Sequence, residues 1–550
     1  MEARGEILVV PFFGQGHLFP CMELCKHFSS DNYKAILIIP SHLSSSVPSS
    51  VRGLSLVEVV EIPNSPSSSP PHPPLPPPSE MTTPPPPALL PELLDGSRPG
   101  PGFGPGPGPL RHHHQQMGSG LEAYLSQKCG ELGQTRRVCA VLDVMMSWSK
   151  EFFVKFEIPT VSFLTSGACS AAMEYAGWKA QVRDMKPGEI RKFDGLPEDM
   201  ELSYSDLKRQ EHHGPHRHGG NVGGPAMDGP NGPPGWRRFG RPDGGNGPPN
   251  GMKLGPPGAG SRPRWLDEVE GSSALLFNTC NDLEHPFIKY LADQIDKPVY
   301  GVGPLLPEKY WKSSGSILHD GEFRSNRKSN YTEDQVIQWM DSKPHRSVIY
   351  VSFGSEVGPS LEEYAELANA LGELNRPFIW VIQPNSGRAG PPPGFMGDES
   401  RSQTKEEGFY PHGLEEKVGD RGLVINGWAP QLLILSHPSL GGFLSHCGWN
   451  STVESIARGV PILAWPIRGD QFHNAKLVVK HLKAGHMLRT GDDPKEMVKK
   501  DGIIRGIDLL LDDKEVHKQA VAVRSRFKNG FPASSVAALK SFLEAIVKKN

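Results

Sequence analysis

The chain has 550 residues, a formal net charge of −3 and a pI near 6.7. This length has room for two or three domains, and so balanced a charge offers no basic field for nucleic acid or an anionic membrane surface. The seven cysteines are scattered and form no C-x-x-C pair, which indicates reduced thiols, and neither end resembles a signal peptide or membrane anchor. We therefore expect a cytoplasmic, monomeric protein without stable membrane insertion.

Three segments are rich in Pro, Gly, Ser or His and poor in apolar residues: 63–118, 211–263 and 384–407. Such sequences bury too little apolar surface to offset the entropy of ordering, so we expect low-complexity inserts without a fixed structure. Their histidines, including the run 112–114, are interpreted as compositional bias and not as a metal site.

The N-terminal half alternates between two patterns. Apolar, β-branched runs predict strands at 7–13, 35–40, 54–62, 138–143 and 160–164, and helical periodicity predicts helices at 119–133 and 165–180. Continuous apolar strands between helices are typical of a parallel sheet that is covered on both faces.

The alternation restarts in the C-terminal half. Strands are predicted at 347–353, 378–382, 423–425, 441–445 and 461–465, with a helix at 360–374 and another that Thr332 caps. The resulting α/β organisation comprises an N-terminal domain (1–305), a linker (306–331), a C-terminal domain (332–530) and a last helix (531–550) that packs back on the N-terminal domain. We expect two facing doubly wound, Rossmann-like domains, with the ligand site in the cleft between them.

The stretch GGFLSHCGWNSTVES at 441–455 lies where a strand gives way to a helix. Unpaired backbone N–H groups and the positive end of the helix dipole form an anion site there, and side-chain donors make it suitable for a diphosphate. A purely local alternative is that Asn450 or Ser451 caps the helix, with Ser451 and Glu454 forming a capping box.

Residues 428–471, which begin with W-A-P-Q, contain H-C-G-W-N-S and end with D-Q, closely resemble the signature segment of plant family 1 UDP-glycosyltransferases. The resemblance extends to G-Q-G-H after the first strand, N-T-x-x-D-L-E at 278–284, V-G-P at 302–304 and S-V-I-Y-V-S-F-G-S at 347–355. It implies a GT-B type fold, with acceptor binding in the N-terminal domain and UDP-sugar binding in the C-terminal domain.

The resemblance also implies a role for each matching residue. Trp428 would stack on uracil while Ala429 and Gln431 address the base and ribose edge. Glu454 would accept the ribose hydroxyls. The phosphates would be held by His446, Asn450, Ser451 and Ser355, and the sugar would face Trp449, Asp470, Gln471 and Thr165.

The reacting group is expected from the N-terminal domain. His17 follows the first strand through a Gly-Gln-Gly turn, so its ring should enter the cleft, where a neutral imidazole can take a proton from an acceptor hydroxyl. By resemblance Asp143, expected two strands along in the same sheet, orients this histidine. Attack on the face opposite UDP would invert the anomeric centre. The scheme requires no metal or other cofactor, and the chain contains no D-x-D.

The partners expected from this resemblance are a UDP-sugar and a small acceptor. Gln471 and Trp449 indicate glucose, because in the resembling family Gln at this position goes with glucose. Asp470 could also cap the following helix. The acceptor pocket is expected around Phe13, Phe19, Met145 and Met146, which suit a planar phenolic such as a flavonoid, with terpenoids and other phenolics as alternatives.

Two other classes of function are less well supported. A nicotinamide oxidoreductase would need a G-x-G-x-x-G fingerprint, but residue 19 is Phe and no ribose-binding acid follows the second strand. A scaffold protein could instead act through the proline-rich run PPHPPLPPP in 63–118, by docking a groove that binds polyproline helices.

Overall fold

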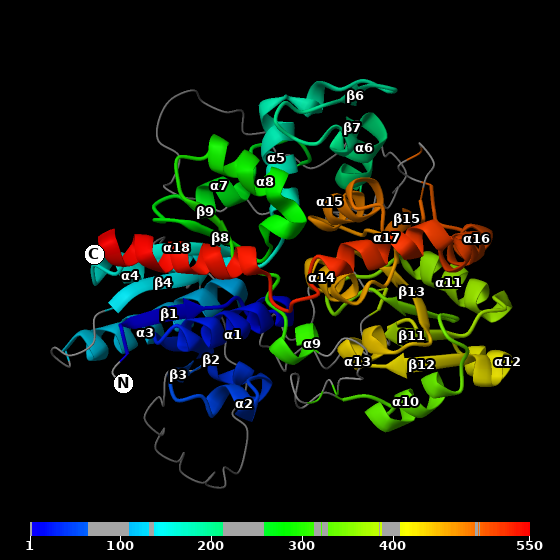
Figure 1. Ribbon diagram of the computed structural model, residues 1–550, viewed down its shortest axis with the longest axis horizontal. Coiled ribbons are helices and arrows are strands. Elements are labelled where there is room, and N and C mark those ends of the chain that lie inside the picture. Colours follow the sequence, from blue (N-terminus) through cyan, green and yellow to red (C-terminus); the bar gives the residue numbers. More distant parts are fainter. Residues whose placement is uncertain are drawn as a thin grey trace, which may run out of the picture.

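The computed structural model describes residues 3–63, 109–130, 137–212, 258–312, 319, 321, 328–383, 386–387, 408–489, 493 and 496–549. These residues form two α/β domains that lie next to each other, each built around one parallel sheet (Figure 1). The predicted class of two doubly wound, Rossmann-like domains is confirmed.

The N-terminal sheet has the order β3-β2-β1-β4-β5-β8-β9. Its strands are β1 (Glu6–Val10), β2 (Lys34–Pro40), β3 (Val57–Ile62), β4 (Arg137–Asp143), β5 (Thr160–Leu164), β8 (Leu275–Phe277) and β9 (Val299–Gly301). Its helices are α1 (Gln15–Ser30), α2 (Ser49–Arg52), α3 (Pro109–Gly130), α4 (Lys150–Lys155), α5 (Ala168–Lys179), α7 (Arg264–Glu268) and α8 (Asn281–Gln294). Strand β4 pairs directly with β1, so the expectation that Asp143 lies two strands from the His17 strand is wrong: the two strands are neighbours.

The C-terminal sheet has the order β12-β11-β10-β13-β14-β15. Its strands are β10 (Val348–Ser352), β11 (Phe378–Ile382), β12 (Gly422–Asn426), β13 (Leu440–Ser445), β14 (Ile462–Ala464) and β15 (Gly485–Met487). Its helices are α10 (Glu333–Asp341), α11 (Leu361–Glu373), α12 (Leu414–Val418), α13 (Gln431–Ser436), α14 (Trp449–Arg458), α15 (Gln471–Lys476), α16 (Lys500–Asp512) and α17 (Lys514–Ser525). Helix α10 begins at the predicted cap Thr332, which forms a capping box with Gln335.

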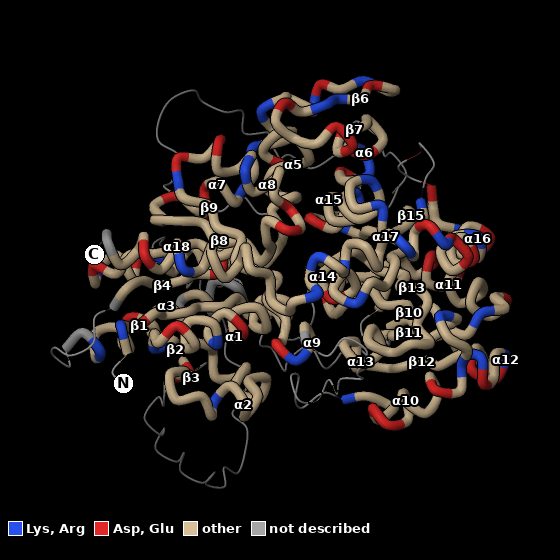
Figure 2. Tube along the Cα trace, viewed as in Figure 1, with Lys and Arg blue, Asp and Glu red and all other residues tan. Residues whose placement is uncertain are grey.

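Both sheets are sandwiched between helices, as their continuous apolar strands require. All five residues of β1, β10 and β11 are buried. Most Lys, Arg, Asp and Glu residues lie on the outer helices and loops (Figure 2). The loops that follow strands of both sheets lie at the cleft, so the carboxyl ends of both sets of strands face it.

The last helix, α18 (Ala533–Lys549), returns from the C-terminal domain and lies along the N-terminal one (Figure 1). It packs on β9 and α8, and the Phe542 ring lies 6.3 Å from that of Phe28 and 5.8 Å from that of Tyr300. Helix α18 therefore ties the two domains together by hydrophobic burial.

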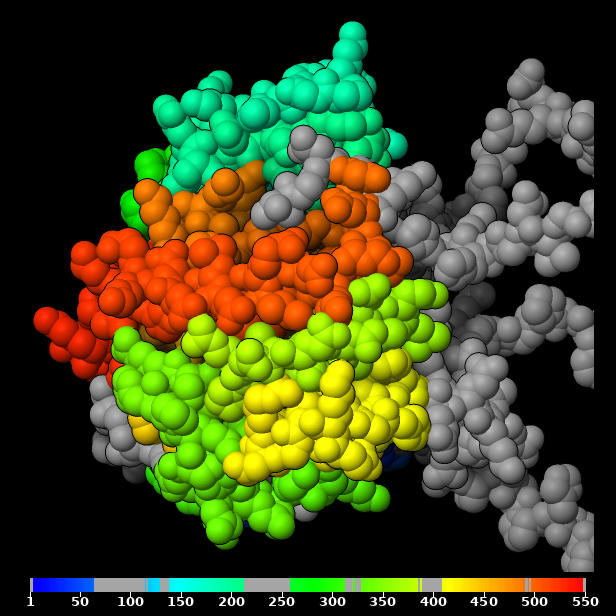
Figure 3. Space-filling model, turned by 90° about the vertical axis from the view of Figure 1, so that its right-hand side faces the viewer, coloured from blue at the N-terminus to red at the C-terminus, as the bar shows by residue number. Residues whose placement is uncertain are grey.

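A second excursion joins the domains on the opposite side of the cleft. It contains β6 (Ile190–Arg191), β7 (Leu202–Ser203) and α6 (Tyr204–His212), and it rests on the C-terminal domain beside α15 (Figure 3). Lys476 of α15 donates to the carbonyl of Glu201 and to Asp206 Oδ2, the latter at 2.9 Å. The cleft is thus bridged by side chains from both domains.

The structure differs from the predicted inserts at their edges. Helix α3 begins at Pro109, inside the segment 63–118, because Met117, Leu121 and Leu125 form one buried stripe. Residues 258–263 and 386–387 are also ordered, and Ser386 Oγ accepts from the N–H of Gln383 at 3.0 Å. Residue 63 and residues 211–212, which end α6, are described as well, and the rest of the three segments, including the proline-rich run, lies outside the described residues.

The predicted linker and strand set also need correction. Residues 308–312 form a helix, α9 (Glu308–Lys312), in which Tyr310 and Trp311 are buried. Strands β8, β9 and β15 were not among the predicted strands.

Candidate active site

A cleft of about 1440 Å³ lies between the two domains. It is lined by the beginning of α1, the loop between β5 and α5, and the loops that follow β10, β12, β13 and β14. These loops leave the carboxyl ends of their strands, which is where open α/β sheets bind ligands.

The His17 imidazole is held by the next strand. Asp143 ends β4, is 1% exposed, and places Oδ2 at 2.7 Å from His17 Nδ1. Its other oxygen, Oδ1, accepts from the backbone N–H of Met145 at 2.9 Å, which fixes the plane of the carboxylate. Nδ1–H therefore donates to Asp143, and this tautomer leaves the lone pair of Nε2 to accept a proton.

The charges around His17 favour its protonated form. Burial alone lowers the pKa of His17, but the Asp143 charge and hydrogen bond, together with Glu356 and Asp470, raise it above its usual value. Thr165, just after β5, adds a contact of 3.1 Å between its Oγ1 and His17 Nδ1. The site can thus take a proton and stabilise the resulting imidazolium.

The first turn of α14 faces the cleft without a side-chain cap. Gly448 is its N-cap residue, so the alternative in which Asn450 or Ser451 caps the helix is wrong, and Glu454 lies too far along for a capping box. A Cβ on Gly448 would lie 2.4 Å from His446 Nε2, so only glycine fits there. The N–H groups of this turn are available to an anion.

His446 is 8% exposed beside this turn. Burial lowers the pKa of His446 to about 4, which keeps the ring neutral. It can therefore donate one hydrogen bond to a phosphate, but it does not carry a positive charge near neutral pH.

Four polar side chains, two of them from α14, form a network at the cleft. Gln431 Nε2 donates to Glu454 Oε2 at 2.6 Å and to Ser451 Oγ at 3.1 Å, and Tyr350 donates to Gln431 Oε1 at 3.1 Å. Glu454 is buried yet lines the cleft. The network orients a carboxylate whose second oxygen can accept from a ligand hydroxyl.

The predicted uracil-binding residues also line the cleft. Trp428 follows Gly427, whose φ of 97° requires glycine, and the N–H of Trp428 donates to Lys328 O at 2.9 Å. Ala429 is buried beside it, and Ser355 is exposed in the loop after β10 of the same domain.

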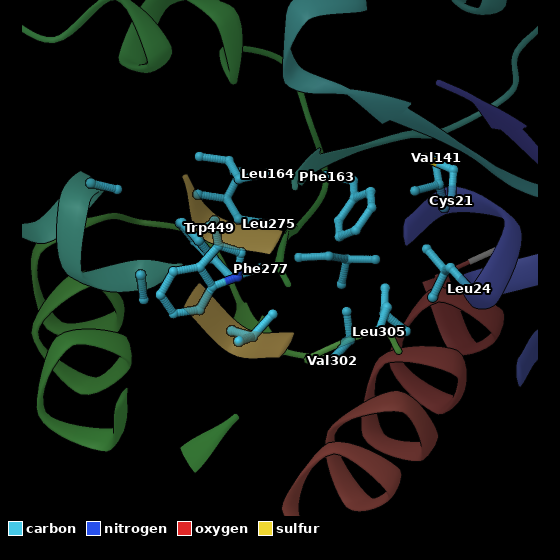
Figure 4. Packing of buried hydrophobic residues seen from close by; sticks show 14 of the residues in the cluster. Cys21, Leu24, Val141, Phe163, Leu164, Leu275, Phe277, Val302, Leu305 and Trp449 are labelled. Atoms are coloured by element: carbon cyan, nitrogen blue, oxygen red, sulfur yellow. The ribbon is translucent and has the colours of Figure 1, made fainter. Parts of the chain in front are cut away.

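Two residues of the signature segment point to the other domain. Asn450 Nδ2 donates to Gly16 O at 2.9 Å, and Trp449 Nε1 donates to Asn278 O at 2.7 Å. The Trp449 indole lies among Leu164, Leu275 and Phe277 (Figure 4). The indole N–H of Trp449 and one amide N–H of Asn450 are thus used within the protein.

Asp470 and Gln471 start α15 at the cleft, with Asp470 at the N-cap position. Asp470 Oδ2 accepts from Asn474 Nδ2 at 3.0 Å, and burial raises the pKa of Asp470. Gln471 also has a local structural role, because its Oε1 accepts from the N–H groups of Ile467 and Arg468 at 2.9 and 3.0 Å.

The four expected acceptor residues separate into two pairs. Phe19 and Met145 line the cleft, whereas Phe13 and Met146 are buried and are not among the lining residues. The reason is that Phe13 packs on Phe12, with ring centroids 5.1 Å apart, and Met146 is fully buried in the core.

The cleft also has lining residues that the sequence analysis missed. They come from α5 and the turn after it, from β7 and α6, and from α7, and include Met173, Glu174, Val182, Leu202, Leu207 and Trp265. Burial is the main cause that raises the pKa of Glu174 to about 7. The sequence held one signal for the lining residues of α5, the helix that follows Thr165. Their spacing places them on one face of the helix, which comprises Ser170, Met173, Glu174 and Gly177.

Among the described ranges, no helix is long and apolar enough to cross a membrane. The same ranges hold no group of three or more His, Cys, Asp or Glu side chains arranged to bind a metal ion.

Comparison with known proteins gives a family match over the C-terminal part. Residues 317–535 match the family model described as UDP-glucoronosyl and UDP-glucosyl transferase. UDP-glycosyltransferase 73C3 of Arabidopsis thaliana is 38% identical over 256 residues, which cover 45% of this chain and 47% of that protein. UDP-glycosyltransferase 73E1 of Stevia rebaudiana is 36% identical over 46% of this chain and 48% of its own length. The chain thus matches about half the length of these curated relatives.

Solved structures resemble the whole fold. Phytolacca americana UGT2, complexed with UDP-2fluoro-glucose and pterostilbene, aligns with a TM-score of 0.62 at 22% identity over 99% of both chains. Glycyrrhiza uralensis UGT73P12, complexed with glycyrrhetinic acid 3-O-monoglucuronide, gives 0.65 at 22% identity over 99% of this chain and 96% of the other. Both alignments support the GT-B arrangement of the two domains.

Proposed function

We propose, from the premise that the chain belongs to the plant family 1 UDP-glycosyltransferases, that it is an inverting O-glucosyltransferase. The observation that carries the proposal is the placement of the His17–Asp143 pair in the same cleft as the first turn of α14. One wall of the cleft can activate a hydroxyl and the other can hold a diphosphate. This combination suits sugar transfer from a nucleotide donor to an acceptor oxygen.

The donor occupies the C-terminal half of the cleft. Trp428 stacks on the uracil, with Ala429 beside it, and Glu454, oriented by Gln431, accepts from the ribose hydroxyls. The diphosphate lies at the first turn of α14, where Ser451, Ser355 and neutral His446 donate to it. Because Asn450 and Trp449 donate to the N-terminal domain, they contribute mainly through their backbone N–H groups.

Transfer proceeds by a single displacement. Nε2 of His17 removes the proton of the acceptor hydroxyl, Asp143 stabilises the imidazolium, and the oxygen attacks the anomeric carbon opposite UDP. The bond to the UDP oxygen breaks as the new bond forms, and the helix N-terminus stabilises the charge on the leaving group. An α-linked donor therefore gives a β-glycoside.

The acceptor is proposed to be a planar phenolic, with a flavonoid as the first choice and terpenoids as the alternative. Phe19, Met145, Met173 and Trp265 supply apolar and aromatic surface on the N-terminal side of the cleft. Glucose is proposed as the sugar because Asp470 and Gln471 lie at the cleft near α14. The proposed cytoplasmic location rests on composition alone.

The deciding experiment is incubation of purified protein with UDP-glucose and a panel of phenolic and terpenoid alcohols, with mass detection of products. A mass increase of one hexose on a phenolic, together with UDP release and a β configuration by NMR, is the expected result. An α product, or transfer that persists in His17→Ala at the wild-type rate, contradicts the proposal.

A further inference from the structure

Asn278 is a buried polar residue that the proposed reaction does not use. It follows β8, belongs to the N-T-x-x-D-L-E element, and is 1% exposed. Its Nδ2 donates to Thr165 O at 3.2 Å and its Oδ1 accepts from Leu305 N at 2.7 Å. One side chain thus joins the loop after β5 to the segment that follows β9.

The backbone of Asn278 also reaches the other domain. Its carbonyl accepts from Trp449 Nε1 at 2.7 Å, and Trp449 is the first residue of α14. The indole fits closely, because a Cβ on Gly167 would lie 2.6 Å from the ring. In Figure 4 this ring lies beside apolar side chains of β5 and β8. Asn278 is therefore in contact with both domains.

A second hydrogen bond ties the same turn of α14 to the N-terminal domain. Asn450, the next residue, donates from Nδ2 to Gly16 O at 2.9 Å, and Gly16 precedes His17. Thr165, which Asn278 holds, places Oγ1 at 3.1 Å from His17 Nδ1. Two successive residues of α14 are therefore tied to two segments that surround the same imidazole.

We propose that Asn278 is a positioning residue, which sets the placement of the diphosphate-binding turn of α14 relative to His17 through Trp449 on one side and Thr165 on the other. The inference rests on the proposed function, because it assigns the turn to the donor and His17 to the acceptor. Displacement requires the reacting atoms to be about 3–3.5 Å apart, and a misplacement of about 1 Å can lower the rate by about 100-fold. A rigid tie between the two half-sites meets this requirement.

The competing explanation is that Asn278 only satisfies buried backbone groups. Loss of a purely structural residue would lower stability and weaken UDP binding along with catalysis. Loss of a positioning residue lowers kcat while the affinity for UDP is kept, and it changes the titration of His17. The two explanations therefore differ in readouts other than stability.

The first test is a double-mutant cycle of Asn278→Asp and Thr165→Val. Asn278→Asp keeps an oxygen for Leu305 N but cannot donate to Thr165 O, and Thr165→Val removes the hydroxyl near His17. We expect each single substitution to lower kcat by about 10-fold or more. The kcat of the double variant should lie no more than about threefold below that of Thr165→Val alone. The pKa of His17, followed by NMR titration, should fall in Thr165→Val and in Asn278→Ala, which adds no charge, because an oxygen near Nδ1 is lost or moved.

The second test addresses the tie between the domains. Trp449→Phe keeps an aromatic ring and removes only the N–H that donates to Asn278 O. The matched control is Trp311→Phe, which changes another buried indole, 6% exposed, outside the cleft. We expect Trp449→Phe to lower kcat by about fivefold or more with the Kd of UDP within about threefold, and Trp311→Phe to match the wild type.

The outcomes separate this inference from the proposed function. Additive effects in the cycle, or an unchanged pKa of His17 in the uncharged variant Asn278→Ala, overturn the positioning role. The positioning role is also overturned if Trp449→Phe has the wild-type kcat, or if it loses kcat and UDP affinity equally. This variant decides the question if Asn278→Asp does not fold. A wild-type protein that binds UDP but transfers no sugar refutes the proposed function, while the NMR titration still tests whether Asn278 controls His17.

Discussion

His17 Nδ1 and Asp143 Oδ2 lie 2.7 Å apart although 126 positions separate the two residues in the chain. The contact exists because β1 and β4 are neighbours in the sheet, and each residue follows or ends one of these strands. It converts an ordinary imidazole into an oriented base.

Replacing His17 by Ala removes this base and leaves the C-terminal half-site intact. General base catalysis contributes about 10²- to 10⁴-fold, so turnover should fall by that factor while the Kd of UDP stays unchanged. Steady-state kinetics and calorimetry with UDP measure the two quantities. Retention of more than about a third of wild-type turnover would count against the assignment of the base.

The pH dependence of turnover should report the Asp143 charge. His17 acts when neutral, so the rate rises with pH through the pKa of His17, which Asp143 raises. In Asp143→Asn the raising charge is lost, so the acidic limb of the kcat profile should move to lower pH while the maximal rate falls. A limb that stays in place or moves to higher pH would show that Asp143 does not set the pKa of the base.

Glu454 should discriminate between nucleotides by their ribose. If its carboxylate accepts from the ribose hydroxyls, Glu454→Gln should weaken UDP binding by about 10-fold or more, because hydrogen bonds to charged groups are worth about 1.5–3 kcal/mol. The matched ligand is 2′-deoxy-UDP, for which the same substitution should cost less. Equal losses for both nucleotides would indicate a role confined to the Gln431 network.

Two substitutions of Gln471 are needed to separate its structural role from its proposed contact with the sugar. Gln471→Glu keeps an oxygen for the N–H groups of Ile467 and Arg468, whereas Gln471→Ala loses it. We expect a wild-type preference for UDP-glucose over UDP-galactose and UDP-glucuronate, loss of most glucosyl transfer in both variants, and UDP affinity close to wild type in Gln471→Glu. Faster turnover of UDP-galactose or UDP-glucuronate by the wild-type enzyme would refute the assignment of the sugar.

The effect of deleting the second low-complexity insert, 211–263, should depend on where the cut is made. Removing 213–257 and closing the gap with a short Gly/Ser linker should leave the circular dichroism spectrum and UDP binding unchanged, because closure cost varies slowly with loop length. Removing 211–263 also deletes Gly260 and Ser261, which line the cleft, and Pro263, the N-cap of α7. This longer deletion should alter acceptor turnover, and equal acceptor kinetics for the two deletions would contradict this role of 258–263.

The sequence by itself determined the alternation of strands and helices, the two-domain α/β class, and the segment that forms the C-terminal wall of the cleft. These features are local: apolar runs, helix periodicity and the fixed order of residues 428–471 can be read without knowing which elements meet. The cap at Thr332 is of the same kind, because the capping box closes within four residues.

Only the tertiary structure decided which of these residues face one another. The adjacency of β1 and β4 and the orientation of Trp449 toward Asn278 both depend on how distant segments cross. The same holds for the acceptor side, where Phe13 and Met146 enter the core while Met173 and Trp265 reach the cleft. An apolar side chain has the same hydropathy in a core and in a pocket, so the packing of its neighbours alone decides between them.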